Sequence, residues 1–345
     1  MLSNARLPVS AVNQVCIAVN NLQKTMEDYW NILGIGPWTV FHYGTPEISD
    51  FKCYGISAQG RCRVAVVKLG AMELKLVETI EGTSIYRDWI SVHGESLHHV
   101  KFLVEDLDID RVRRVMESLG FPDIMSGHIG TNGKGQFACF DTSKALHAIW
   151  ETSNHIWDKP EGATNFPENM EAVSPAKVKV ERIRQVALCV KDVVRTAQNY
   201  WNILGIGPWS IYDWGTHVLE RRLYHGKPSW GREIVAFAYI GDVQLELVQP
   251  VEGDSIYADW MSVHGEGLHH LKFLCDDVDE VSAMLTGQGF PSILSGHYGP
   301  PGGKAGGYNY IDIPPLHCIW EPVQEPMVMP AEPFLIFPGK LHQPE

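Results

Sequence analysis

The chain has 345 residues, of which 45% are hydrophobic and 20% charged, and its formal net charge is −13. This length predicts about two packed domains, and the acidic balance argues against nucleic acids and anionic membrane surfaces as partners, since both select basic proteins. No apolar stretch reaches the length of a membrane span, and the start of the chain lacks the basic segment and apolar core of a secretion signal, so we expect a cytoplasmic protein.

A tandem repeat dominates the sequence. Residues 14–102 and 185–273 align without a gap at an offset of 171 residues (185 minus 14), and both carry the segments WNILGIGPW and SVHGE. Such a duplication fixes the architecture. Each repeat is followed by a stretch with several prolines, which disfavour long helices. We expect four segments: a first domain at 1–153, a linker at 154–182, a second domain at 183–323, and a tail at 324–345 that wraps the surface or crosses to a partner in a homodimer.

The apolar pattern of each repeat predicts two similar units. The first unit opens with a strand near Gln14, continues with a helix in LQKTMEDYWNIL and closes with a hairpin that turns at Gly70-Ala71. The second unit opens with a strand at His99, has apolar residues at helical spacing over 109–119, and ends in the hairpin QFACFDTSKALHAIWE. The second copy has the same order, with its turn at Gly241-Asp242. Four βαβββ units predict an α+β fold.

The seven cysteines do not indicate a disulfide framework, because their number is odd and no CxxC pair occurs. Cys16 and Cys189 occupy equivalent places in the two copies, on strands that we predict to be buried. We interpret the cysteines as small core residues of a protein in a reducing compartment.

The doubled unit resembles the domain of the vicinal oxygen chelate superfamily, which includes glyoxalases, methylmalonyl-CoA epimerases, extradiol dioxygenases and fosfomycin- and bleomycin-resistance proteins. The most specific similarity is HGEGLHHLKF at 264–273, which looks like the epimerase segment that carries a metal-binding histidine, together with the strand ending ELVQP. The resemblance implies two tandem domains with cupped mixed sheets. It also implies one divalent metal ion in a cup, held by the first and last strands of both units.

Mapped residue by residue, the resemblance implies a metal site in the second domain similar to the glutamine–glutamate–histidine–glutamate site of glyoxalase I. An amide oxygen, an imidazole and two carboxylates suit a borderline divalent cation such as Zn, Mn, Co, Ni or Fe. The implied donors are Gln185, Glu246, His270 and Glu321, and the same positions of the first domain hold Gln14, Lys75, His99 and Glu151.

The two sets of donors differ in charge at one position. Lys75 stands where the second copy has Glu246, and an ammonium group repels a cation and offers no lone pair. We expect Lys75 to pair with Glu151 and the first site to be weak or empty, unless Glu73, two residues earlier on the same face, replaces the missing carboxylate.

Each implied donor also has an ordinary interpretation. Gln185 could be a buried amide bonded to backbone, Glu321 an exposed carboxylate at a strand end, and Gln244 could take the place of Glu246 on the same face. In the pair His269–His270 one ring is expected to be structural, and we assign that role to His269.

The second domain has aromatic and histidine residues in loops where the first copy differs, and such residues suit a flat or apolar organic ligand. Their alternative role is ordinary packing. The glycine-rich segment 297–310 is interpreted as a mobile lid. The expected pocket residues are Tyr212, Trp214, Tyr224, His225, His297 and Tyr298.

The leading hypothesis is a metal-dependent isomerase, epimerase or lyase that transfers a proton next to a carbonyl of a small, aromatic or apolar metabolite, with Glu321 or Glu246 as the base. The first alternative is an Fe(II) extradiol-type ring-cleaving dioxygenase, whose site resembles two histidines and one glutamate, whereas Gln185 stands at the first-strand position here. The second alternative is a non-catalytic small-molecule-binding protein of the resistance type.

Overall fold

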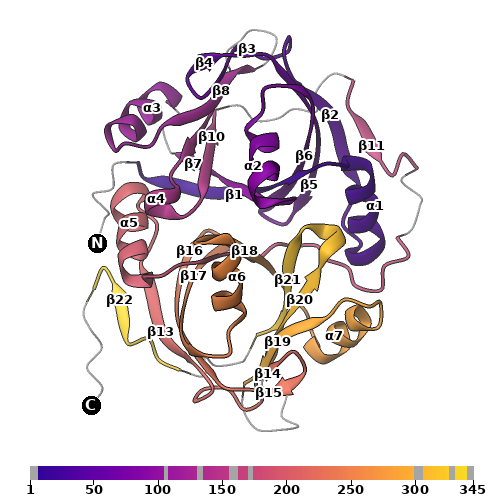
Figure 1. Cartoon of the computed structure of the whole chain (residues 1–345), viewed down its shortest axis with the longest axis vertical. Coiled ribbons are helices and arrows are strands. Elements are labelled where there is room, and N and C mark those ends of the chain that lie inside the picture. Colours follow the sequence, from indigo (N-terminus) through magenta and orange to yellow (C-terminus); the bar gives the residue numbers. More distant parts are fainter. Residues whose placement is uncertain are drawn as a thin grey trace. The chain divides into compact units, whose positions relative to one another are not determined.

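The computed structural model describes residues 7–104, 108–129, 135–154, 162–169, 174–298, 306–325 and 331–339. The chain divides into two compact units whose boundary lies between Glu181 and Arg182. Each unit contains one copy of the repeat and one large mixed sheet (Figure 1). The α+β fold with two tandem domains that the sequence predicts is confirmed.

In the described part of the first domain, eleven strands form one sheet in the order β11-β2-β5-β6-β1-β7-β10-β9-β8-β3-β4. The first strand of each unit, β1 and β7, pair with each other in antiparallel fashion, and each also pairs in parallel with the last strand of its own unit. The elements are β1 (Val9–Val19), α1 (Leu22–Leu33), β2 (Trp38–Gly44), β3 (Ser49–Cys53), β4 (Ile56–Ser57), β5 (Gly60–Leu69), β6 (Met72–Gly82), α2 (Ile85–His93), β7 (Ser96–Val104), α3 (Ile109–Ser118), β8 (Asp123–Ile129), β9 (Gly135–Asp141), α4 (Ser143–Leu146), β10 (Ile149–Ser153) and β11 (Thr164–Phe166).

The described part of the second domain repeats this plan with eleven strands in the order β15-β14-β19-β20-β21-β18-β12-β17-β16-β13-β22. Its central strands β17, β12, β18 and β21 correspond to β6, β1, β7 and β10. The elements are β12 (Gln185–Cys189), α5 (Val193–Leu204), β13 (Trp209–Gly215), β14 (Leu223–Tyr224), β15 (Lys227–Pro228), β16 (Gly231–Ile240), β17 (Val243–Gly253), α6 (Ile256–His264), β18 (Gly267–Leu274), α7 (Val278–Thr286), β19 (Ser292–His297), β20 (Gly307–Ile313), the 3₁₀ helix η1 (Pro314–Leu316), β21 (Cys318–Gln324) and β22 (Leu335–Phe337).

The repeated WNILG segment is explained by the ends of helices α1 and α5. Asn21 and Asp192 cap the two helices, since each side chain accepts a hydrogen bond from a backbone N–H three residues on. Each helix ends at a glycine in the left-handed region, Gly34 with φ 63° and Gly205 with φ 69°, which other residues adopt at a cost. The duplicated motif therefore belongs to the scaffold.

Helices α2 and α6 were not predicted from the sequence. Both begin after a serine, Ser84 or Ser255, whose hydroxyl caps the first turn. Their buried residues come directly after this cap, and in the second domain they are Ile256 and Tyr257. Helix α6 packs against β17 and β18, and thereby brings the Tyr257 ring to the central strands.

The proline-containing stretches add edge strands to the domain that each follows. In the expected linker, β11 pairs with β2, and the Val180 N–H donates to Leu33 O at 2.9 Å. In the tail, β22 pairs with β13, and the Phe334 N–H donates to Ile211 O at 2.9 Å. Parts of the expected linker, tail and lid lie outside the described residues, namely 155–161, 170–173, 299–305, 326–330 and 340–345.

All seven cysteines lie within the described residues as free thiols, and Cys16 and Cys189 are fully buried, as the sequence predicts. Within the same residues, no helix combines the length and the apolar character that crossing a membrane requires.

Candidate metal centre and adjoining cavity

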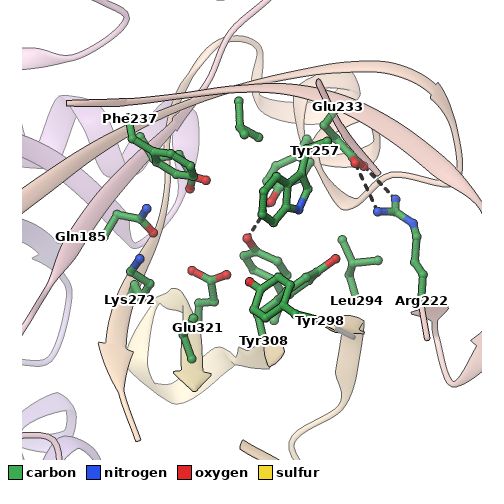
Figure 2. A pocket seen from close by; sticks show the side chains of 15 residues that line it. Gln185, Arg222, Glu233, Phe237, Tyr257, Lys272, Leu294, Tyr298, Tyr308 and Glu321 are labelled. Carbon is green, nitrogen blue, oxygen red and sulfur yellow. Dashed lines mark hydrogen bonds and ion pairs between the residues drawn. The ribbon is translucent and has the colours of Figure 1, made fainter. Parts of the chain in front are cut away.

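The implied donors of the second domain lie on the four central strands. Pairing of β12 with its two neighbours aligns Ala187 with both Glu246 and His270, so their side chains project from one face of the sheet. His270 Nε2 lies 3.2 Å from Glu246 Oε2 and 3.3 Å from Glu321 Oε2. Gln185, Glu246 and Glu321 line a cavity, and the fully buried His270 ring lies behind the two carboxylates. Figure 2 shows Gln185 and Glu321 facing the same hollow.

Gln185 Oε1 is buried and has no hydrogen-bond partner among the described residues, and the equally buried Glu246 Oε2 and His270 Nε2 face each other at 3.2 Å. Gln185 Nε2 donates to Gln244 Oε1 at 2.5 Å, which leaves Oε1 as the free end of the amide. Each buried unsatisfied polar atom costs about 1–3 kcal/mol, and such atoms are rare in packed interiors. Their convergence indicates a place for a polar or cationic ligand.

The side chains of His, Cys, Asp and Glu alone form no complete three-ligand group within the described residues. The closest approach to one is the contact of His270 with the two carboxylates. The candidate metal centre therefore depends on the amide oxygen of Gln185 as an additional donor.

His269 holds the neighbouring ring in place. The two Nδ1 atoms of His269 and His270 are 2.9 Å apart, so one ring donates a hydrogen bond to the other. When His270 is the donor, its Nε2 keeps the lone pair that a metal needs. The His269 ring is buried against Tyr257 and Trp260, with ring centroids 5.1 and 5.3 Å away. These contacts agree with the structural role that the sequence assigns to His269.

The two carboxylates make this place attractive to positive charge. Burial lowers the pKa of His270, but Glu246 and Glu321 outweigh burial and raise the pKa to about 9. The first domain shows the opposite balance, because burial there keeps the pKa of His99 below its ordinary value although Glu151 lies beside it.

In the first domain, the ion pair that the sequence predicts is present. Lys75 Nζ lies 3.1 Å from Glu151 Oε2, and His99 Nε2 lies 3.0 Å from the same oxygen. Glu73 does not replace the missing carboxylate, because it accepts a hydrogen bond from Gln14 Nε2 at 2.8 Å and so takes the place that Gln244 has in the second domain. The ammonium group of Lys75 thus places a positive charge of the chain itself beside Glu151, where the second domain has its candidate cation site.

A cavity that opens toward solvent lies beside Gln185. One end is polar, with Gln185, Glu246, Glu321 and Lys272 in its wall. The opposite wall carries the charged pair Arg222–Glu233 (Figure 2). The walls between them are mainly aromatic and consist of Trp214, Phe237, Tyr257, Tyr298, Tyr308 and Tyr310.

Of the six expected pocket residues, Trp214 and Tyr298 line this cavity. Tyr212 packs behind the wall, with its ring centroid 5.6 Å from that of Phe237 and 6.3 Å from that of Trp214. Tyr212 therefore supports the cavity without forming its surface.

The other three expected residues are not part of the cavity wall. The Tyr224 hydroxyl donates to Asp259, and the His225 ring packs edge-to-face against Tyr224, with ring centroids 4.4 Å apart. His297 Nε2 lies 2.9 Å from Asp279 Oδ1. The short strand β14 pairs with β19 at the outer edge of the sheet, and this pairing directs Tyr224, His225 and His297 to other partners.

The sequence analysis did not find Arg222, Glu233 and Lys272. Lys272 Nζ donates to Gln244 Oε1 at 3.0 Å, next to the amide of Gln185. A lysine, Lys101, occupies the same position of the first copy, so the comparison of copies gave no signal there. Arg222 and Glu233 do differ between the copies. The comparison of the copies that singled out Glu246 and Lys75 could also have found them.

The chain belongs to the Glyoxalase/Bleomycin resistance protein/Dioxygenase superfamily, whose family profile matches residues 13–140 and 184–310. The two matches coincide with the two copies of the repeat. This membership confirms the resemblance to vicinal oxygen chelate proteins that the sequence motifs indicate.

A solved structure of a remote relative, at 15% identity, shows the fold of the chain but not its reaction. The uncharacterized protein YqjC of Bacillus subtilis (strain 168) is 34% identical over 89 residues, which are 25% of this chain and 64% of YqjC. A mutant 4-hydroxymandelate synthase from Streptomyces coelicolor superposes with a TM-score of 0.58 at 15% identity, over 92% of this chain and 93% of that chain. The Mn(II)-bound glyoxalase from Novosphingobium aromaticivorans gives a TM-score of 0.46 at 14% identity, over 92% of this chain and 83% of that chain.

Proposed function

We propose that the second domain is the active site of a metal-dependent isomerase, epimerase or lyase that transfers a proton next to a carbonyl group. The observation that carries this proposal is the convergence of three buried donor atoms: Gln185 Oε1, which has no hydrogen-bond partner among the described residues, and the facing pair Glu246 Oε2 and His270 Nε2. Glu321 completes the set at 3.3 Å from His270 Nε2.

The spacing and chemistry of these atoms fit a divalent cation. Donors that lie about 2.0–2.2 Å from an ion lie about 3.0–3.4 Å from one another, and the two His270–carboxylate distances are 3.2 and 3.3 Å. The carboxylates of Glu246 and Glu321 neutralise two positive charges. One imidazole with three oxygen donors suits Mn, Fe, Co, Ni or Zn.

Gln185, Glu246, His270 and Glu321 would hold the divalent cation, which would supply polarisation of a substrate carbonyl or of a pair of vicinal oxygens. The chain supplies the proton transfer, because Glu321 and Glu246 both border the cavity and either carboxylate can take a proton from the adjacent carbon and return it. Lys272, held by Gln244, places a positive charge at the same end of the cavity, where it stabilises negative charge on a substrate oxygen.

The cavity supports a small and partly flat substrate. Aromatic rings form most of the wall between its two polar ends, and such walls favour apolar or aromatic groups and exclude water.

The donor set supports this reaction class over ring cleavage by Fe(II). Non-heme iron oxygenases use two histidines and one carboxylate. Among the described residues, the second nearby imidazole is that of His269, whose Nδ1 faces His270 Nδ1 and whose ring is enclosed by Tyr257 and Trp260.

Substitution of each carboxylate by its amide tests the proposal. We expect the wild-type protein to bind one divalent ion and to exchange solvent deuterium into members of a panel of 1,2-dicarbonyl compounds and α-hydroxyketones. Glu321→Gln or Glu246→Gln, whichever removes the base, should slow exchange by about 10²- to 10⁴-fold. NMR measures the exchange and elemental analysis the metal content. Wild-type exchange rates in both variants would exclude these carboxylates as bases. If the wild-type protein binds compounds of the panel without any divalent metal, the alternative of a non-catalytic binding protein is favoured.

A further inference from the structure

A buried ion pair forms the wall opposite the candidate metal centre. Arg222 precedes β14, and its Nη1 and Nη2 donate to Glu233 Oε2 and Oε1 at 3.2 and 2.7 Å. Nη2 also donates to the backbone oxygen of Asp254. Arg222 is 4% and Glu233 2% exposed. Figure 2 shows the pair across the hollow from Gln185 and Glu321.

The fold does not require this pair. At the repeat offset of 171 residues, the first domain has Phe51 and Cys62 in the places of Arg222 and Glu233. Both belong to a packed apolar cluster and are 7% exposed. A buried ion pair is often no more stabilising than apolar residues of similar volume, so its presence beside a cavity indicates a role in binding.

The pair still has unused hydrogen-bonding capacity. A guanidinium group has five N–H donors, of which three are directed to Glu233 and Asp254, and Arg222 also makes a side-chain hydrogen bond with Tyr308. Arg222 Nε is buried, and it has no partner within the described part of the chain. Each Glu233 oxygen can accept a second hydrogen bond. A hydroxyl group matches this pattern, because it donates one hydrogen bond and accepts others.

The charge of the cavity argues for a neutral group at this end. The charged side chains of the wall are two cations, Arg222 and Lys272, and three carboxylates, Glu233, Glu246 and Glu321. Their formal sum is −1, which a divalent cation changes to +1. One anionic oxygen at the metal end then balances the cavity, and a second anion at the Arg222–Glu233 end has no counter-charge.

We propose that Arg222 and Glu233 form a recognition subsite for an uncharged hydroxyl group of the substrate. The substrate class is then a small molecule with vicinal oxygens at one end, a flat apolar body and a neutral hydroxyl at the other end. This inference rests on the proposed function in that it assigns the second end of the same cavity.

Aryl hydroxamates test the subsite, because their two adjacent oxygens chelate divalent metals. The probes are benzohydroxamate, phenylacetohydroxamate and 3-phenylpropionohydroxamate, each unsubstituted, 4-hydroxylated or 4-carboxylated, so that three lengths are covered. With the Mn²⁺-loaded full chain, calorimetry should show that the 4-hydroxy probe of the fitting length binds about 10- to 100-fold more tightly than the unsubstituted probe. The 4-carboxy probe should bind no better than the unsubstituted one.

The double variant Arg222→Phe/Glu233→Cys is the matched control, since it copies the first domain. We expect it to bind Mn²⁺ as the wild type does, within about threefold, and to lose the preference for the 4-hydroxy probe over the unsubstituted one. The inference is overturned when wild type shows no such preference, when the 4-carboxy probe binds best, or when the double variant keeps the preference.

A second arm separates failure of the subsite from failure of the metal proposal. If the protein binds neither Mn²⁺ nor any hydroxamate, the proposed metal centre is wrong. The hydroxyl subsite is then measured without metal by ligand-observed NMR with p-cresol and toluene. Stronger binding of p-cresol by wild type than by the double variant supports the subsite, and equal binding overturns it.

Discussion

Replacement of Glu246 by lysine is expected to abolish divalent metal binding by the second domain and leave that domain folded. The first domain shows why the fold should tolerate the change, because Lys75 occupies the equivalent position and pairs with Glu151 at 3.1 Å. The introduced ammonium group can pair with Glu321 in the same way. Repulsion between this charge and a divalent cation about 4 Å away is on the order of several kcal/mol, which corresponds to a loss of affinity of more than about 10³-fold. Elemental analysis and circular dichroism of Glu246→Lys measure the two effects.

The reciprocal change supplies the matched control. Lys75→Glu gives the first domain the same four donor types, and we expect metal content to rise from one to two ions per chain. The added ion should not create a second active site, because Phe41, Phe51, Phe137 and Cys139 belong to a packed apolar cluster in that domain. A Lys75→Glu protein that still holds one ion would show that the Glu/Lys difference does not decide metal binding.

The second large effect concerns the ion pair of the first domain. Glu151→Gln leaves the Lys75 ammonium buried without its carboxylate, and removal of one partner from a buried pair destabilises a protein by about 3–5 kcal/mol. The double variant Lys75→Met/Glu151→Gln should recover most of this loss, because it removes both charges. Hydrogen exchange of the amides in β10 reports on the first domain separately from the second. Equal protection of β10 in wild type and Glu151→Gln would contradict a stabilising role for the pair.

The same pair predicts how stability depends on pH. Burial alone would raise the pKa of Glu151, but Lys75, His99 and Lys101 together hold the pKa well below its ordinary value. A carboxylate with a lowered pKa stabilises the folded state fully above the unfolded-state pKa of about 4.5, and this contribution declines as pH falls through the folded-state value. The wild-type first domain should therefore lose more stability below about pH 4.5 than the double variant. Hydrogen exchange of β10 as a function of pH checks this difference.

The duplication explains why much of the fold was predictable. The resemblance to vicinal oxygen chelate proteins implied the donors Gln185, Glu246, His270 and Glu321, and the strand register brings them to one face. Repeat positions, apolar periodicity and the glycine turns at Gly70 and Gly241 gave the βαβββ order. These features depend on local backbone geometry and on spacing, which a sequence records directly.

The cavity wall was harder to predict, because it depends on how loops meet the sheet. Arg222 lies two residues before Tyr224, yet Arg222 lines the cavity and Tyr224 contacts Asp259. Tyr224 belongs to β14, which pairs with β19, whereas Arg222 lies just before this strand, and no local pattern specifies that pairing. The aromatic residues of the loop were therefore a weaker guide than the charge differences between the copies.

The most direct test is elemental analysis of the purified chain combined with anomalous X-ray scattering from crystals of the Mn²⁺-loaded protein. We predict one divalent ion per chain, with an anomalous peak between Gln185 Oε1, His270 Nε2 and the carboxylates of Glu246 and Glu321. A protein without bound metal after Mn²⁺ loading, or an anomalous peak at any other place in the second domain, would contradict the account.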